Sequence, residues 1–221
     1  MSISNNLTKI KASLPSHVTL VAVSKTKPVA DLMEAYEAGQ RIFGENKIQE
    51  MTEKWEVMPK DIQWHMIGHV QTNKVKFMAE YVSLIHGVDS LKLLQEINKQ
   101  AKKHNRVIDV LLQIYIAEEE SKFGLDEKEL NELLQQVQND KSSFENINIV
   151  GLMGMATFTE NQNQIEKEFK HLKTVFDTIN SKDAINCVST LSMGMSGDYQ
   201  LAISCGSTMV RIGSSIFGTR N

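Results

Sequence analysis

The sequence predicts an α/β protein with one domain, a single (β/α)8 TIM barrel preceded by an N-terminal helix. Eight short apolar runs rich in Val, Ile and Leu alternate with helical patterns along the 221 residues, and parallel strands covered on both faces have this composition. Each unit averages about 27 residues, close to what a β/α barrel needs. No segment rich in Pro, Gly or Ser divides the chain, so we expect one domain over residues 1–221. An open doubly wound sheet alternates in the same way but usually has fewer strands.

The chain begins with an amphipathic pattern. Ile3, Leu7, Ile10 and Leu14 recur every three or four residues, which predicts a leading helix with one apolar face. Pro15 follows immediately and ends it.

The first β/α unit shows how the later units are built. The run 18–25 is apolar and β-branched and ends in Lys25, which predicts a buried strand with a lysine at its carboxyl end. Pro28 has a φ suited to a first helical turn, so a helix over 29–38 is expected, and Gly39 supplies its end. In a barrel, Lys25 would point into the end where active sites are built. The alternative is a lysine that extends from the strand end into solvent.

The remaining units repeat this order. Ser90 is placed to cap the helix that follows the fourth strand. The loop 117–124 after the fifth strand is acidic. The further predicted strands cover 41–46, 62–67, 82–89, 107–116, 147–155, 186–191 and 208–212, and the further helices 47–57, 72–80, 91–103, 127–139, 162–180 and 198–204.

The last strand carries a candidate anion site. Gly213 and Ser214 lie where this strand meets a short helix, so backbone N–H groups and a hydroxyl would face the barrel mouth. Loops after strands seven and eight often hold a phosphate in barrel enzymes, and Ser192 would supply the neighbouring loop. Arg211 points into the barrel if Gly213 does. A buried guanidinium needs a partner, and a carboxylate such as Glu45 or Asp89 is the structural alternative.

These groups form one candidate site, because the first and last strands of a closed barrel are neighbours. A phosphorylated aldehyde suits all three: the amine of Lys25 forms a Schiff base, the N–H groups bind the anion and Arg211 binds a ring nitrogen. Pyridoxal 5'-phosphate (PLP) is such a molecule.

Five motifs spread from the first strand to the last resemble the pyridoxal phosphate homeostasis protein family, also called YggS or PROSC-like. Together they are specific, although each alone is weak. They are the segments 21–26 (VAVSKT), 43–46 (FGEN), 64–69 (WHMIGH), 191–196 (LSMGMS) and 206–213 (GSTMVRIG) with 216–218 (IFG).

The resemblance implies a fold similar to the N-terminal barrel domain of alanine racemase. It implies that Lys25 carries the aldimine, that Arg211 faces the pyridine nitrogen and that Asn46 lies beside the cofactor ring. It also implies that the phosphate is taken by Ser192, Gly213 and Ser214.

The resemblance further implies a binding protein, active in intracellular PLP homeostasis and amino-acid pool balance, with no catalytic residue. An arginine opposite the ring nitrogen keeps its proton, which leaves the ring a weak electron sink. The sequence ends soon after the phosphate segment, so no second acid/base domain is expected, and Tyr115 is expected only at the rim. A PLP-dependent racemase or lyase and, from another class, a Schiff-base aldolase remain the alternatives.

Composition limits the partners. A net charge of -3 gives no broad attraction to nucleic acid or membrane, and no run of eighteen apolar residues or secretory signal is present, which predicts a cytoplasmic protein. A monomer is expected, with PLP-dependent apoenzymes as candidate recipients. His65 and His69 do not share a helical face, so no metal site is expected, and the two cysteines, Cys187 and Cys205, are expected to be small buried residues.

Overall fold

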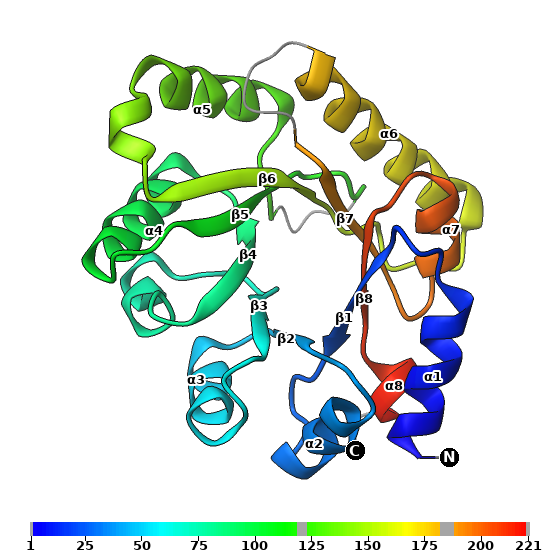
Figure 1. The fold of residues 1–221 in the computed structure, drawn as a ribbon. Coiled ribbons are helices and arrows are strands. Elements are labelled where there is room, and N and C mark those ends of the chain that lie inside the picture. Colours follow the sequence, from blue (N-terminus) through cyan, green and yellow to red (C-terminus); the bar gives the residue numbers. More distant parts are fainter. Residues whose placement is uncertain (1, 119–122, 182–187, 220–221) are drawn as a thin grey trace.

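The computed structural model describes residues 2–118, 123–181 and 188–219. Its eight parallel strands close into one barrel in sequence order, and β1 pairs with β8. Helices surround the barrel (Figure 1). The predicted (β/α)8 barrel is therefore confirmed. The strands are β1 (Thr19–Val23), β2 (Ile42–Glu45), β3 (Gln63–Met66), β4 (Val82–Val88), β5 (Ile108–Gln113), β6 (Ile147–Met153), β7 (Thr190–Met195) and β8 (Met209–Ile212).

The helices follow the predicted order. The leading helix packs against the second helix and against the last one at the chain's other end (Figure 1). Ser90 caps the fourth helix by accepting the N–H of Leu93, as predicted. The helices are α1 (Ile3–Ser13), α2 (Val29–Glu37), α3 (Ile48–Val57), η1 (Thr72–Phe77), α4 (Leu91–Lys103), α5 (Glu127–Asn139), η2 (Lys141–Phe144), α6 (Gln162–Ser181), α7 (Tyr199–Ser204) and α8 (Ser214–Phe217).

The segment after β3 and the fifth strand differ from the prediction. The segment after β3 is a 3-10 helix, η1, and not an α-helix. The fifth strand ends at Gln113, beyond which only an isolated bridge joins Ile114 to Leu125. Residues 119–122 of the predicted acidic loop lie outside the described residues.

The largest difference is the position of the seventh strand, which was predicted over 186–191. The strand starts at Thr190 and includes Ser192, Met193 and Gly194, which were predicted to form a loop. The two glycines and two serines of this stretch suggested a turn, but a closed barrel supplies pairing partners on both sides: Leu152 of β6 pairs with Leu191, and Ser192 pairs with Met209 of β8. Residues 186 and 187, including Cys187, lie outside the described residues, whereas Cys205 is buried, as predicted.

The apolar core has two parts, as expected for a barrel covered by helices. The larger part lies between the sheet and the helices. A smaller cluster fills the interior of the barrel, and its buried members are Val21, Leu84, Leu111, Met153 and Met209. In β8, Met209 belongs to this interior cluster. Arg211, two residues nearer the carboxyl end of the strand, faces the pocket. In β8, the barrel interior therefore changes from apolar to polar between Met209 and Arg211. In the described parts of the chain, no helix is long and apolar enough to cross a membrane.

Candidate functional site

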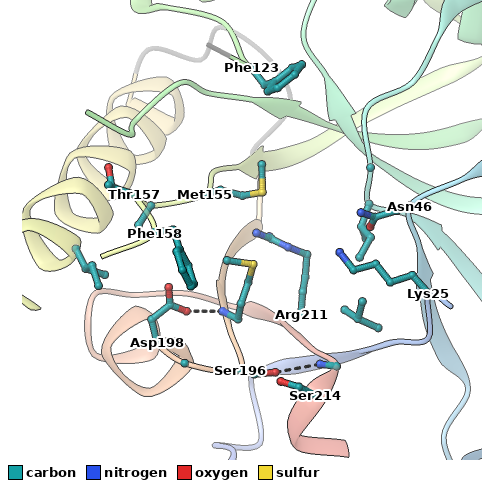
Figure 2. A pocket seen from close by; sticks show the side chains of 18 of the residues that line it. Lys25, Asn46, Phe123, Met155, Thr157, Phe158, Ser196, Asp198, Arg211 and Ser214 are labelled. Carbon is teal, nitrogen blue, oxygen red and sulfur yellow. Dashed lines mark hydrogen bonds between the residues drawn. The ribbon is translucent and has the colours of Figure 1, made fainter. Parts of the chain in front are cut away.

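A pocket of about 600 Å³ opens at the carboxyl ends of the strands. Five of the six residues predicted to bind the cofactor line it, namely Lys25, Asn46, Arg211, Gly213 and Ser214. Figure 2 shows the side chains of Lys25 and Arg211 extending into the same space. This end of a β/α barrel is where the active sites of such enzymes are built.

Lys25 reaches the pocket because of strand alternation. Val21 belongs to the interior cluster and Val23 lines the pocket, so Lys25, two residues further along, continues the same inward alternation. Val21 pairs with Arg211 of β8. The lysine and the arginine therefore come from adjacent strands, as the closed barrel predicted. The alternative reading, a lysine extended into solvent, does not describe this side chain, which is only partly exposed and lines the cavity.

Arg211 is buried without a bonded carboxylate among the residues that the structure describes. Its Nη1 donates to the carbonyl oxygen of Ser192 at 2.9 Å and to Ser192 Oγ at 2.7 Å, and its Nη2 donates to the carbonyl oxygen of Gly154 at 3.1 Å. The predicted alternative partners are engaged elsewhere: Glu45 binds Lys54 and Asp89 binds His69. Burial lowers the pKa of Arg211 to about 10, so the guanidinium remains a cation at neutral pH. A guanidinium has five N–H donors, so donors remain for an acceptor in the pocket.

A chain of buried hydrogen bonds runs from Arg211 across the barrel interior. Ser192 Oγ lies 3.2 Å from His86 Nδ1, and His86 Nε2 lies 3.1 Å from His65 Nδ1. Arginine can only donate, so the Ser192 hydroxyl accepts from Arg211, whereas the directions of the Ser192–His86 and His86–His65 hydrogen bonds are set by the tautomers of the two imidazoles. Burial lowers the pKa of His65 to about 3 and that of His86 well below its usual value. Both imidazoles are therefore neutral at physiological pH. Among Arg211, Ser192, His86 and His65, only Arg211 carries a positive charge.

Ser192 is thus not where it was predicted. It is fully buried inside the barrel and does not line the pocket, so its hydroxyl orients Arg211 instead of facing a phosphate at the mouth. The error follows from the misplaced seventh strand, which left Ser192 in a predicted loop.

Ser196, which the sequence reasoning missed, occupies the place predicted for Ser192. Its Oγ accepts the N–H of Gly213 at 3.2 Å, and it lines the pocket beside Ser214 (Figure 2). The hydroxyls of Ser196 and Ser214 and the start of α8 form a polar surface next to Lys25 and Arg211. A signal was present in the sequence, because Ser196 is the second serine of the same Ser-Met-Gly-Met-Ser stretch.

Asn46 lines the pocket from the end of β2, and its backbone is tightly packed. A Cβ on Gly68 would lie 2.4 Å from the carbonyl oxygen of Asn46, so only glycine fits there. This close approach holds the ends of β2 and β3 together beneath the asparagine.

The opposite rim of the pocket is apolar and exposed. Phe158 is 96% exposed, Phe123 51% and Met155 39%, and all three line the pocket (Figure 2). The loops that carry them are joined by buried Glu168 of α6, which accepts the N–H groups of Glu118 and Thr157. No residue of this rim was predicted from the sequence.

Comparison with known proteins agrees with this geometry. The family model described as "Alanine racemase, N-terminal domain" matches residues 1–221. The pyridoxal phosphate homeostasis protein of Pasteurella multocida is 37% identical over 234 residues, which cover 100% of this chain and 99% of the relative.

Solved structures show the same fold. PipY of Synechococcus elongatus, solved with PLP bound, has a TM-score of 0.89 at 33% identity, covering 98% of this chain and 100% of PipY. An alanine racemase of Clostridium difficile in complex with cycloserine has a TM-score of 0.81 at 16% identity, covering 99% of this chain and 60% of the racemase, which shows a shared fold. The chain belongs to the alanine racemase N-terminal domain family and, within it, to the pyridoxal phosphate homeostasis proteins.

Proposed function

We propose that this protein binds PLP covalently through Lys25 and takes part in intracellular PLP homeostasis and amino-acid pool balance without catalytic turnover. The observation that carries the proposal is a lysine amine and a buried guanidinium with no bonded carboxylate, which line one pocket from adjacent strands among the described residues. The relatives support it, because PipY has been solved with PLP bound and the Pasteurella multocida protein is named for PLP homeostasis.

The residues present fit PLP in charge and in chemistry. When PLP is bound, its aldehyde condenses with a lysine amine, which forms a C=N bond and releases water. Lys25 supplies the amine, and Asn46 supplies a polar side chain beside it. Ser196, Gly213 and Ser214 offer the polar surface for the phosphate, and Arg211 offers N–H donors to the pyridine nitrogen.

The interior network argues for binding over turnover. Arg211 does not give up its proton at neutral pH. His86 and His65 behind it are neutral, so none of these three groups protonates a ring nitrogen. A pyridine nitrogen that stays unprotonated makes PLP a poor acceptor for the electrons of a carbanion. The chain's own residues therefore hold the cofactor more readily than they activate it.

The binding proposal is tested with the purified protein. We expect a yellow protein whose absorbance shifts on reduction with borohydride, and a reduced adduct that maps to Lys25 by mass spectrometry. Lys25→Ala should lose the adduct completely. Lys47→Ala is the matched control, because Lys47 is exposed at the start of α3 and does not line the pocket. An unchanged adduct in Lys25→Ala would overturn the proposal.

The absence of turnover is tested separately. The loaded protein is incubated with each common L-amino acid, and racemisation is followed by chiral chromatography beside free PLP at the same concentration. We expect rates no higher than those of free PLP. A faster rate that disappears in Lys25→Ala would favour the PLP-dependent racemase over the carrier.

We further propose that the protein acts in the cytoplasm as a monomer and passes PLP to apoenzymes. Sedimentation should give the mass of one 24.9 kDa chain. An apo-aminotransferase mixed with the loaded protein should regain activity faster than PLP dissociates from the loaded protein into buffer. Recovery at the rate of free dissociation would exclude direct transfer.

A further inference from the structure

The backbone on both sides of Lys25 is held by side chains from another element. The carbonyl oxygen of Ser24 accepts from Lys54 Nζ at 2.9 Å, and the Ser24 hydroxyl donates to Glu45 Oε1 at 2.6 Å. On the other side of the lysine, the N–H of Thr26 donates to Glu50 Oε1 at 2.6 Å. The residue before Lys25 and the residue after it are thus both attached to charged groups, two of which, Glu50 and Lys54, lie on α3.

These three charged side chains form one cluster, which we call the α3 clamp: Glu45, Glu50 and Lys54. Lys54 Nζ lies 2.7 Å from Glu45 Oε1 and 2.8 Å from Glu50 Oε1. Glu45 is completely buried and Lys54 nearly so, whereas Glu50 is partly buried. Ion pairs removed from water are kept in a fixed geometry by the cost of leaving any member unpaired, so the clamp is a rigid support.

The α3 clamp lies behind the wall of the barrel and not in the pocket. Successive side chains of a strand face opposite sides of a sheet, so Ser24 faces the helices while Lys25 faces the interior. None of the three clamp residues lines the pocket. They can act on the lysine only through the backbone of Ser24 and Thr26.

The clamp also holds an unusual backbone conformation. Thr26 has φ of 65°, one of two non-glycine residues in the described chain with positive φ. A β-branched residue in this region is strained and persists only when its surroundings hold it there. The Thr26 side chain is exposed, so the bond from its N–H to Glu50 is a contact that can hold it.

We propose that Glu50 and Lys54 are positioning residues for Lys25: through the backbone of Ser24 and Thr26 they hold the strained turn that directs the lysine amine into the pocket. This inference rests on the proposed role of Lys25 in binding PLP. Without the clamp, Thr26 would relax out of its left-handed conformation and carry the amine away from the position in which it meets the aldehyde.

The first test compares two substitutions on the same helix in the full-length protein. Glu50→Ala removes the acceptor of the Thr26 N–H. Glu53→Ala is the matched control, because Glu53 is exposed and accepts from the Gln49 side chain. Without PLP, we expect the Thr26 amide to exchange with deuterium at least tenfold faster in Glu50→Ala and unchanged in Glu53→Ala. With PLP, the affinity of Glu50→Ala should fall about tenfold to a hundredfold, the usual loss for a hydrogen bond to a charged group.

The second test separates positioning from general loss of stability. In the Glu50→Ala background, Thr26→Gly should restore most of the lost affinity, because glycine adopts positive φ without strain. Thr26→Ala in the same background should restore none. Rescue by both or by neither would overturn the proposal, as would equal affinity of Glu50→Ala and Glu53→Ala. If the unaltered protein formed no borohydride-stable adduct on Lys25, the proposed function itself would fail, whatever the exchange of the Thr26 amide showed.

Discussion

Two buried polar networks lie on opposite sides of the barrel strands, one inside the barrel and one between the strands and α3, and they differ in charge. The interior network joins Arg211 to Ser192, His86 and His65 and contains one cation with no bonded carboxylate among the described residues. The α3 clamp, on the helix side, joins one cation to two carboxylates. Both are attached to strands that lead to the pocket.

The difference separates holding a ligand from holding the scaffold. A buried cation without a carboxylate leaves donors for an acceptor that arrives from outside, whereas a cation between two carboxylates has its interactions satisfied by the protein. We therefore propose that the interior network serves ligand binding and that the α3 clamp serves stability and position. The predictions below test this contrast, and the substitutions are ordered from the largest expected effect on stability at neutral pH to the smallest.

Among the substitutions, the largest loss of stability at neutral pH should come from Lys54→Met. It removes the cation of the α3 clamp and leaves Glu45, whose pKa burial already raises, without a counter-charge. We expect the free energy of unfolding in urea to fall by about 3–5 kcal/mol. The control is Lys170→Met, which breaks an exposed pair with Glu166 at 2.6 Å and should leave the free energy of unfolding nearly unchanged, because solvent screens such a pair. Equal losses at the two sites would remove the distinction between the networks.

The interior network should make stability depend on pH. His65 and His86 have lowered pKa values in the folded state, so below about pH 6.5 the unfolded chain takes up protons that the native protein does not. Each histidine should then lower the free energy of unfolding by about 1.4 kcal/mol per pH unit as the pH falls from 6.5 toward 4, with no effect above that window.

Denaturation in urea at a series of pH values measures this slope. Replacing His65 and His86 by glutamine should flatten it, while His104→Gln, at an exposed histidine, should leave it unchanged. A slope that persists in the double variant would mean that other groups cause the acid sensitivity.

Arg211→Met should lower the stability less than Lys54→Met does, and its main effect should be on the affinity for PLP. It removes a buried cation that has no bonded carboxylate, and it leaves the carbonyl oxygen of Gly154 without this donor, so we expect a loss of about 1–3 kcal/mol at most. The affinity for PLP should nevertheless fall at least tenfold, because the donors facing the pocket are gone. Urea denaturation and spectroscopic titration measure the two effects. Destabilisation as large as that of Lys54→Met would contradict the assignment.

The smallest effect should come from the apolar rim, which belongs to neither network. Phe158 is 96% exposed, so Phe158→Ser should change the free energy of unfolding by less than about 0.5 kcal/mol. The affinity for PLP should also remain within about threefold, because the polar groups proposed to bind it lie on the other side of the pocket. A tenfold loss would show that the rim takes part in holding the cofactor.

Much of the site could be predicted because it depends on strand ends. Lys25, Asn46 and Gly213 each lie one or two residues past the end of a strand, and the carboxyl ends of parallel strands meet at one end of a barrel. Ser192 was misassigned because the stretch contains two serines, Ser192 and Ser196, and either could lie at the barrel mouth. Which of them does so depends on where the strand ends.

The sequence by itself determined the order of strands and helices and the residue types at the barrel mouth, because hydrophobic periodicity and strand-end residues are local signals. Only the tertiary structure decided which polar groups meet behind that mouth. His86 and Ser192 are 106 residues apart and Ser24 and Lys54 are 30 apart. Their contacts depend on the closure and register of the barrel, which set the face and depth of every side chain. The partner of Arg211, and with it the charge left for a ligand, therefore had to come from the fold.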